Sequence, residues 1–140
     1  MEIIIDKSEC RENLHNQSAH LAVKLSAPEY IASTDEDRER IMPLLSASFL
    51  ELHQLLSPYA ELSDEEQNVR YKLSMPKNWK DCQYTALDEL CREYVKQTFF
   101  ARWLDFVKAD SAAFYRTLNQ NIAMAVKHIL ALRKKPVRTE

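Results

Sequence analysis

The chain contains no glycine among its 140 residues, although average usage of about 7% would supply roughly ten. Glycine forms the loops that cradle phosphates, and it permits the sharp turns of several catalytic and calcium-binding motifs. The phosphate-binding P-loop, the dinucleotide fingerprint, the nucleophile elbow and the EF-hand loop are therefore excluded. Tight two-residue β-hairpins also lose their preferred residue. The sequence thus points to an architecture more clearly than to a chemistry.

Length and composition predict a single helical domain over residues 1–140. Hydrophobic residues make up 46% of the chain and charged residues 29%, with a net charge of -2. This balance excludes an intrinsically disordered chain, which combines low hydrophobicity with high net charge. No run of about 18 apolar residues exists, so a membrane protein is excluded as well. Residues 136–140, beginning at a proline, are expected to fray.

Apolar residues at helical spacing predict four helices. They are expected over residues 7–25, 34–56, 79–107 and about 110–135. Asp6 and Thr34 are the expected N-caps of the first two. The short connection at 108–110 makes the last two helices an antiparallel hairpin. In the last helix, apolar residues recur at the alternating steps of three and four that form a coiled-coil-like seam: Tyr115, Leu118, Ile122, Ala125, Ile129 and Leu132.

Short strands complete the predicted fold. Residues 69–75 alternate strictly between apolar and polar side chains, which is the period of a half-buried strand. Such a strand needs a partner, and the candidates are residues 2–6 of the same chain or a strand of another molecule. The acidic segment 60–68 is expected to be a loop. The predicted fold is therefore mainly α: a bundle of four helices with a long C-terminal antiparallel hairpin and one or two short strands.

The candidate chemical residues do not form a site. Cys82 and Cys91 are nine residues apart, which is not a zinc-ligand spacing, and with Cys10 they are interpreted as buried, inert thiols. The histidines are not spaced as a metal pair on one helix face. No carboxylate pair or serine stands in a recognisable catalytic setting. We therefore expect no catalytic residues, no bound metal and no cofactor.

Charge is divided unevenly along the chain. Residues 1–75 carry 7 basic and 14 acidic side chains, whereas residues 76–140 carry 12 basic and 7 acidic ones. The two halves either attract each other within one fold or meet head to tail between copies, as in rings and filaments. The basic tail is a weak candidate for nucleic-acid binding, and its residues are Arg133, Lys134, Lys135 and Arg138.

Aromatic residues surround most of the second half of the third predicted helix. They form the core of the helical hairpin or a self-association surface, because interfaces are enriched in Trp, Phe and Tyr. The alternating strand at 69–75 offers a second way to pair between subunits. The interface candidates are Phe99, Phe100, Trp103, Phe106, Tyr71 and Leu73.

Four segments follow one another in an order that resembles a known class of proteins. They are Asp6–Glu9 after a short strand, Thr34–Glu39 at a helix start, Tyr71–Pro76 in a strand, and the basic Arg133–Pro136 end. The layout resembles small helical proteins from tailed-phage and prophage structural gene clusters, of the head–tail connector or neck type. This resemblance implies a ring of identical subunits that joins the portal of a capsid to the tail. It implies no catalytic residues.

Together these features predict a non-enzymatic structural or assembly protein that associates with itself, in a ring if the resemblance holds, and with neighbouring assembly proteins. The alternative is a small cytosolic regulatory module that binds protein or nucleic acid, as a monomer or as a dimer through the seam of the last helix. A cytoplasmic location is expected, or the virion if the chain derives from a phage. Nucleic acid is the less favoured partner.

Overall fold

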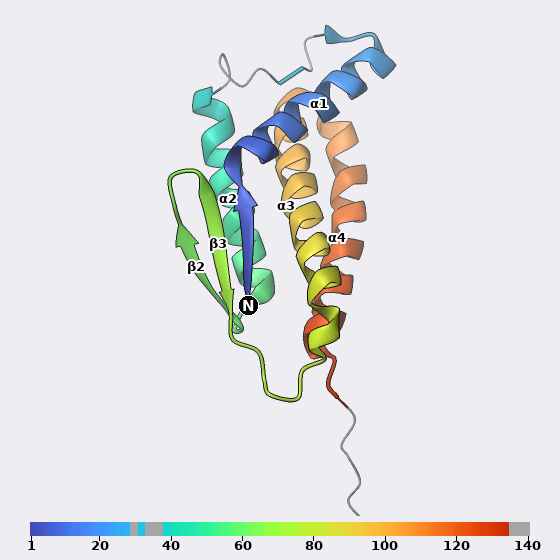
Figure 1. Cartoon of the computed structure of the whole chain (residues 1–140). Helices are drawn as coiled ribbons and strands as arrows, with labels where there is room; N and C mark the ends of the chain where they lie inside the picture. The colour runs from blue at the N-terminus through green and yellow to red at the C-terminus, as the bar shows by residue number, and fades with distance from the viewer. Residues whose placement is uncertain (29–30, 33–37, 135–140) are drawn as a thin grey trace, which may run out of the picture.

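A computed structural model of the chain describes residues 1–28, 31–32 and 38–134. Its elements are β1 (Glu2–Asp6), α1 (Lys7–Leu25), α2 (Arg38–Leu56), β2 (Ala60–Asp64), β3 (Asn68–Leu73), the 3-10 helix η2 (Asp81–Gln83), α3 (Tyr84–Val107) and α4 (Ala109–Ala131). The mainly helical fold with an antiparallel α3–α4 hairpin is confirmed (Figure 1). The predicted helix start at Thr34 and the predicted fraying of residues 136–140 lie outside the described residues.

The sheet is larger than predicted. Its three strands are antiparallel in the order β1-β3-β2, and Tyr71 of β3 lies opposite both Ile3 and Leu62. The expectation of one or two strands, with a loop at 60–68, is therefore wrong. The acidic residues of this segment are typical of a loop, but its backbone pairs with β3. Asp64, at the end of β2, forms an ion pair with Lys7 (2.5 Å).

The ends of α1 show how the chain turns without glycine. Asp6 accepts hydrogen bonds from the backbone N–H groups of Ser8 (2.7 Å) and Glu9 (3.3 Å), so it caps the helix as predicted. At the other end Ser26 adopts a left-handed conformation with φ of 53°, a position that usually holds glycine. Its N–H donates to the Val23 carbonyl (3.2 Å), so that one of the last carbonyls of the helix has a hydrogen-bond partner.

The start of α3 differs from the prediction of a helix beginning at residue 79. Trp79 instead forms an isolated β-bridge with Arg133. Its indole N–H donates to the Ile129 carbonyl (2.9 Å), and its side chain is buried. Because the backbone of Trp79 takes part in this extended bridge, it does not begin a helix, and α3 starts only at Tyr84.

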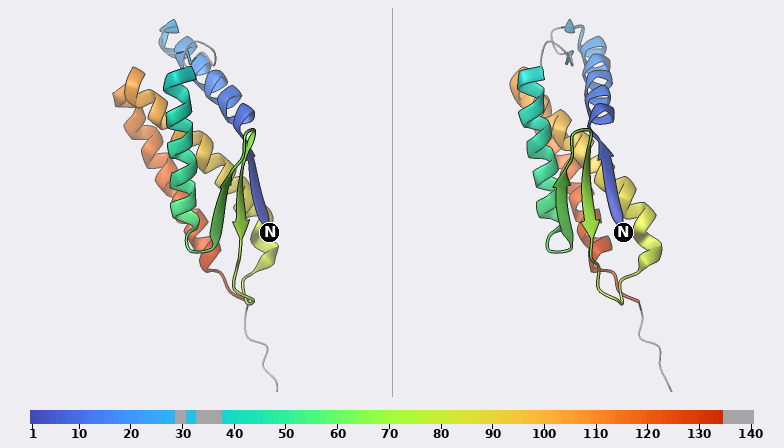
Figure 2. Two further views of the ribbon diagram at one scale, coloured as in Figure 1. Left: turned by 90° about the vertical axis from the view of Figure 1, so that its left-hand side faces the viewer. Right: turned by 60° about the vertical axis from the view of Figure 1, so that its left-hand side comes forward.

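The central helix of the molecule is α3, which packs against α1, α2, α4 and β1. Figures 1 and 2 show the sheet beside α2, with α1 running obliquely in front of α3. One face of the sheet contributes alternate residues to the core, among them Ile3, Ile5 and Val69. One hydrophobic cluster joins these residues to the helices. This arrangement surrounds α3 and leaves one side of α4 toward solvent.

Candidate interaction surface

The predicted aromatic interface lies mostly inside the chain. Phe99, Phe100 and Trp103 are at most 1% exposed. Because α3 packs against three helices and a strand, these three aromatic side chains find partners in the same chain. Their prediction as an exposed self-association surface is therefore corrected: they form the core. Phe106, one turn further on, is 61% exposed, and the Arg40 guanidinium lies 5.8 Å from its ring centroid.

The strand candidates Tyr71 and Leu73 are also core residues, 0% and 5% exposed. Tyr71 donates its hydroxyl hydrogen to the Phe49 carbonyl (2.7 Å), and burial raises the pKa of this phenol. Since β3 is the middle strand, β1 and β2 occupy both of its edges. Of the two partners predicted for this strand, residues 2–6 of the same chain are confirmed as β1, and pairing with another molecule is not what the fold shows.

The described part of the basic tail is held by the chain itself. Arg133 donates to the carbonyls of Leu130 (2.7 Å) and Leu132 (2.8 Å), which closes the C-terminal end of α4. Lys134 lies 3.6 Å from an Asp81 oxygen in an exposed ion pair. The other two predicted tail residues, Lys135 and Arg138, lie outside the described residues. The first two residues of the tail therefore bind other groups of the same chain.

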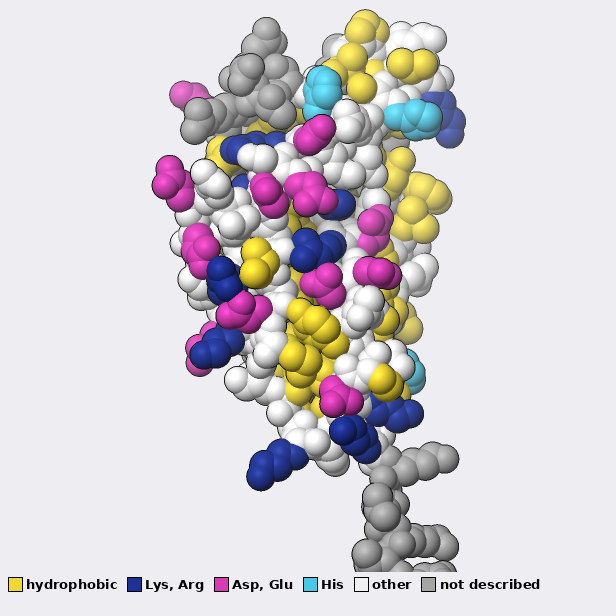
Figure 3. Space-filling view, in the orientation of Figure 1, with side chains coloured by type: hydrophobic (Ala, Val, Ile, Leu, Met, Phe, Trp, Pro, Cys, Tyr) yellow, Lys and Arg dark blue, Asp and Glu magenta, His cyan; other side chains and the backbone are white. Residues whose placement is uncertain are grey.

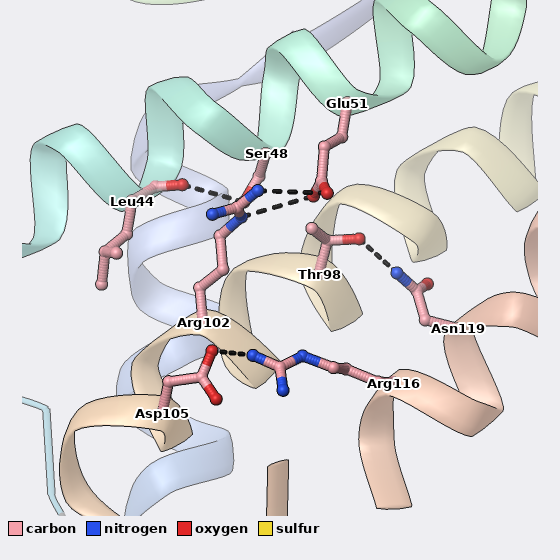
Figure 4. Close-up of polar contacts among 8 residues, drawn as sticks. All are labelled: Leu44, Ser48, Glu51, Thr98, Arg102, Asp105, Arg116 and Asn119. Carbon is pink, nitrogen blue, oxygen red and sulfur yellow. Dashed lines mark hydrogen bonds and ion pairs between the residues drawn. The ribbon is translucent and has the colours of Figure 1, made fainter. Parts of the chain in front are cut away.

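A polar hollow of about 360 Å³ lies between α2, α3 and α4. On the α2 side, Glu51 accepts from two nitrogens of Arg102, at 3.3 Å to Nε and 3.1 Å to Nη2 (Figure 4). Nearby, buried Ser48 donates to the Leu44 carbonyl of its own helix (2.9 Å). The forked Arg102 pair therefore ties α2 to α3 at the mouth of this hollow.

Two further polar contacts tie α3 to α4 across the same hollow. Asn119 donates its amide to the hydroxyl of Thr98, and Arg116 pairs with Asp105 (Figure 4). Thr98 is 5% exposed, so its hydrogen bond is largely shielded from water. Burial also raises the pKa of the neighbouring phenol of Tyr94. These side chains contact one another across the helices, whereas the buried Oδ1 of Asn119, which lines the hollow, has no hydrogen-bond partner.

The inner side of α4 is apolar and closed. Ala112 and Val126 are fully buried, and Leu130 is 5% exposed. They pack within the same core cluster as α3. Of the predicted seam, Ile129 joins this buried side at 8% exposure. The seam therefore does not lie at the centre of the buried face but along its border.

The outer side of α4 carries an apolar strip that we call the α4 stripe, composed of Phe114, Leu118, Ile122 and Ala125. Phe114 is 61% exposed and Leu118 41% exposed, while the other two are half-buried. At 100° per residue these four side chains fall within one quarter of the helix circumference. Hydrophobic side chains follow the edge of the molecule over α4 in Figure 3.

Charge is nearly absent from this part of the helix. Between residues 111 and 126, Arg116 is the sole charged residue, and it is paired with Asp105 across the hollow. Leu118, Ile122 and Ala125 of this surface belong to the predicted seam, and the uncharged run is a second signal in the sequence that points to the same surface. Interface centres are depleted in charged residues in the same way.

A groove of about 400 Å³ adjoins the stripe, between α1 and α4. Phe100 and Tyr115 line it with their rings edge to face, 4.8 Å between centroids. Tyr115 also packs edge to face against Phe114 of the stripe (5.3 Å). The residues of α1 that line the groove are Asn16, Gln17, His20, Leu21 and Lys24. The groove and the stripe thus form one continuous surface through Tyr115.

The cysteines divide between core and surface. Burial raises the pKa of the Cys10 and Cys91 thiols to about 12, so both remain protonated at neutral pH and are poor nucleophiles. Cys82 is exposed, contrary to its interpretation as a buried thiol. Within residues 1–28, 31–32 and 38–134, no three His, Cys, Asp or Glu side chains gather as a metal site would require.

Comparisons of the whole chain with protein-family models, curated proteins and solved structures gave no match. Among the described helices, none combines the length and the apolar character needed to cross a membrane. The arrangement of side chains is therefore the basis for any functional conclusion.

Proposed function

We propose that this protein is a non-catalytic assembly subunit that associates with itself through the α4 stripe. The observation that carries this proposal is an exposed helix surface with a phenylalanine at 61% exposure and almost no charge. Contiguous exposed apolar surface commonly marks a site of protein–protein contact. Burial of aromatic and aliphatic area then supplies the free energy of association.

This proposal keeps the self-association expected from the sequence but replaces the α3 surface by α4, whose seam the sequence offered as the dimer contact of the alternative function. The connector-type role implied by the resemblance to phage proteins fits such a subunit, and we include it in the proposal as the setting. In that setting the protein would lie in the cytoplasm or, if phage-derived, in the virion. A ring would additionally need a contact between two different surfaces of neighbouring copies.

Charge provides a candidate for that second contact. Two ion pairs join the acidic first half to the basic second half within one chain, Lys96 with Glu9 (3.5 Å) and Arg102 with Glu51 (3.1 Å). Most acidic side chains of the first half that the structure describes do not take part in such pairs, so head-to-tail attraction between copies stays a prediction. It should weaken as salt screens exposed charges, whereas association through the α4 stripe should not.

The alternative function is a small regulatory module in which the same stripe binds a different protein. A nucleic-acid role is less favoured, because Arg133 and Lys134 already bind groups of the same chain. That role would require a salt-dependent interaction with DNA that is lost when residues 133–140 are removed.

The decisive experiment is a concentration series of solution mass by light scattering at low and high salt. We expect a mass above 16.4 kDa that rises with concentration and persists in high salt. Leu118→Glu should return the protein to a monomer. Leu50→Glu is the matched control, since Leu50 is an exposed leucine (54%) on α2. A wild-type protein that is monomeric at every concentration and salt would refute self-association.

A further inference from the structure

We propose that the polar hollow between α2, α3 and α4 is a binding site for a small organic carboxylate that also carries a hydroxyl group. The hollow has a volume of about 360 Å³, within the range of about 300–1,000 Å³ that is typical of small-molecule sites. Its lining comes from three helices, so a molecule bound there would contact all of them (Figure 4). This inference concerns a surface other than the α4 stripe and does not depend on self-association.

The hollow contains a hydrogen-bond acceptor that the described part of the chain leaves without a partner. The side-chain amide of Asn119 donates through Nδ2 to the Thr98 hydroxyl, whereas its Oδ1 is buried and accepts no hydrogen bond from any described residue. Buried polar atoms nearly always have a partner, because an unpaired one loses its hydration without compensation. The hydroxyl group of a bound molecule would donate to Oδ1 and supply that partner.

The charged side chains of the lining favour an anion over water or a neutral molecule. They are Arg102, Arg116 and Glu51, which leaves one positive charge in excess. Glu51 accepts from Nε and Nη2 of Arg102 at 3.3 and 3.1 Å, so these two charges offset each other. Arg116 pairs with Asp105 through Nη2, at a place where both side chains are substantially exposed. Because a guanidinium has five N–H donors, Arg116 can bind a carboxylate in the hollow while it keeps this ion pair.

The spacing on α4 indicates how the two groups of the ligand are arranged. Arg116 and Asn119 are three residues apart, so they lie on the same side of the helix, about 4.5 Å apart along its axis. A carboxylate bound by Arg116 therefore places a hydroxyl near Oδ1 of Asn119 when only a few carbon atoms separate the two groups. Ala101 and Ala123 also line the hollow, and their small side chains leave room for that carbon skeleton.

The remaining polar groups of the lining do not oppose an anion. Burial raises the pKa of the Tyr94 phenol, so this side chain stays protonated and neutral near pH 7. Gln120 adds an uncharged amide at an exposed position. Since neither group carries a charge, the excess positive charge beside Arg116 remains available to the ligand.

A ligand titration of the full chain, followed by two-dimensional proton–nitrogen NMR, tests this proposal. The probes are β-hydroxybutyrate, butyrate, which lacks the hydroxyl, and the corresponding diol, which has an alcohol in place of the carboxylate. We expect saturable shifts with β-hydroxybutyrate at the side-chain amide of Asn119 and at the backbone amides of Thr98 and Arg116. Loss of either group should weaken binding at least about tenfold, because each makes a hydrogen bond that the probe lacking it cannot replace.

One variant and its matched control locate the binding in the hollow. Arg116→Gln removes the charge that we propose for the carboxylate and should weaken the affinity for β-hydroxybutyrate at least about tenfold. Lys127→Gln should leave the affinity unchanged, since it removes a positive charge from an exposed position of α4 outside the lining. Circular dichroism of both variants confirms that they are folded before their affinities are compared.

Several results would overturn the inference. If β-hydroxybutyrate gave no saturable shifts, the hollow would hold water only. Equal binding of butyrate would exclude the donor to Asn119, and equal binding of the diol would exclude the carboxylate site. An equal loss of affinity in Lys127→Gln would indicate attraction to the overall charge of the chain instead of binding in the hollow. Solution mass measured on the same samples reports self-association separately, so failure of one proposal is distinguishable from failure of the other.

Discussion

The two sides of α4 differ in whether their side chains have contacts within the chain. Toward the hollow, Asn119 and Arg116 contact side chains of α3, and Val126 is fully buried. On the outer side, Phe114 and Leu118 remain exposed to 61% and 41%. Both sides belong to the same 23-residue helix. The difference shows that seam spacing predicts helix packing but not whether the partner belongs to the same molecule.

The aromatic residues of α3 are mostly buried and several apolar residues of α4 are exposed, because the two helices have different numbers of neighbours. The middle helix packs against α1, α2, α4 and β1, so most of its apolar side chains are covered, with Phe106 near its C-terminal end as an exposed exception. The last helix lies at the edge of the bundle and has neighbours on one side. An edge helix with apolar residues on both sides leaves some of them exposed, and this is the surface that we propose for self-association.

The largest effect is expected in the covered core. Trp103→Ala should lower the free energy of unfolding by about 3–5 kcal/mol, because it removes a buried indole and leaves a cavity. Denaturant unfolding followed by circular dichroism measures this change. If the variant kept wild-type stability and lost only its association, Trp103 would belong to an interface and the assignment of α3 to the core would fail.

The polar side of α4 should show an intermediate effect. Asn119→Ala removes the donor to the buried Thr98 hydroxyl and should cost about 1–3 kcal/mol of stability. Solution mass at a fixed concentration should stay unchanged, because this residue lies away from the stripe. Thermal and chemical unfolding report the stability, and a change in mass without a change in stability would contradict the division between the two sides.

The exposed side should show the reverse pattern. Leu118→Glu should weaken self-association at least about tenfold, which corresponds to roughly 1.4 kcal/mol. Its effect on unfolding of the monomer should stay within about 0.5 kcal/mol, as for other exposed positions. Sedimentation equilibrium compares it with Leu50→Glu. Equal association of the two variants would remove the distinction between the α4 stripe and an ordinary exposed leucine.

The smallest effect is expected at the exposed ion pair on the rim of the hollow. Arg116→Ala breaks the contact with Asp105, and both side chains are substantially exposed (56% and 36%). Exposed pairs contribute about 0–1 kcal/mol, and salt should reduce the contribution further. Unfolding at low and high salt measures it. A loss well above this range would show that the hollow depends on the ion pair for its structure.

Much of the fold could be read from local patterns. Asp6 as a helix cap, the helical spacing of α1 to α4 and the alternation in β3 each arise from neighbours a few residues apart. The strand β2 is not predicted because its acidic, largely exposed residues are typical of a loop, whereas its backbone is held by the ladder with β3. The predicted start of α3 at residue 79 is wrong because the backbone of Trp79 forms a bridge with Arg133, far away in the sequence.

The sequence alone determined which residues of this protein are apolar, at what spacing they recur, and where charge is absent. Those properties specify helices and their apolar sides, because backbone geometry repeats every few residues. Tertiary structure alone decided that Trp103 is covered and Phe114 is not. The physical reason is that burial depends on how many elements surround a helix, and this number is a property of the assembled bundle.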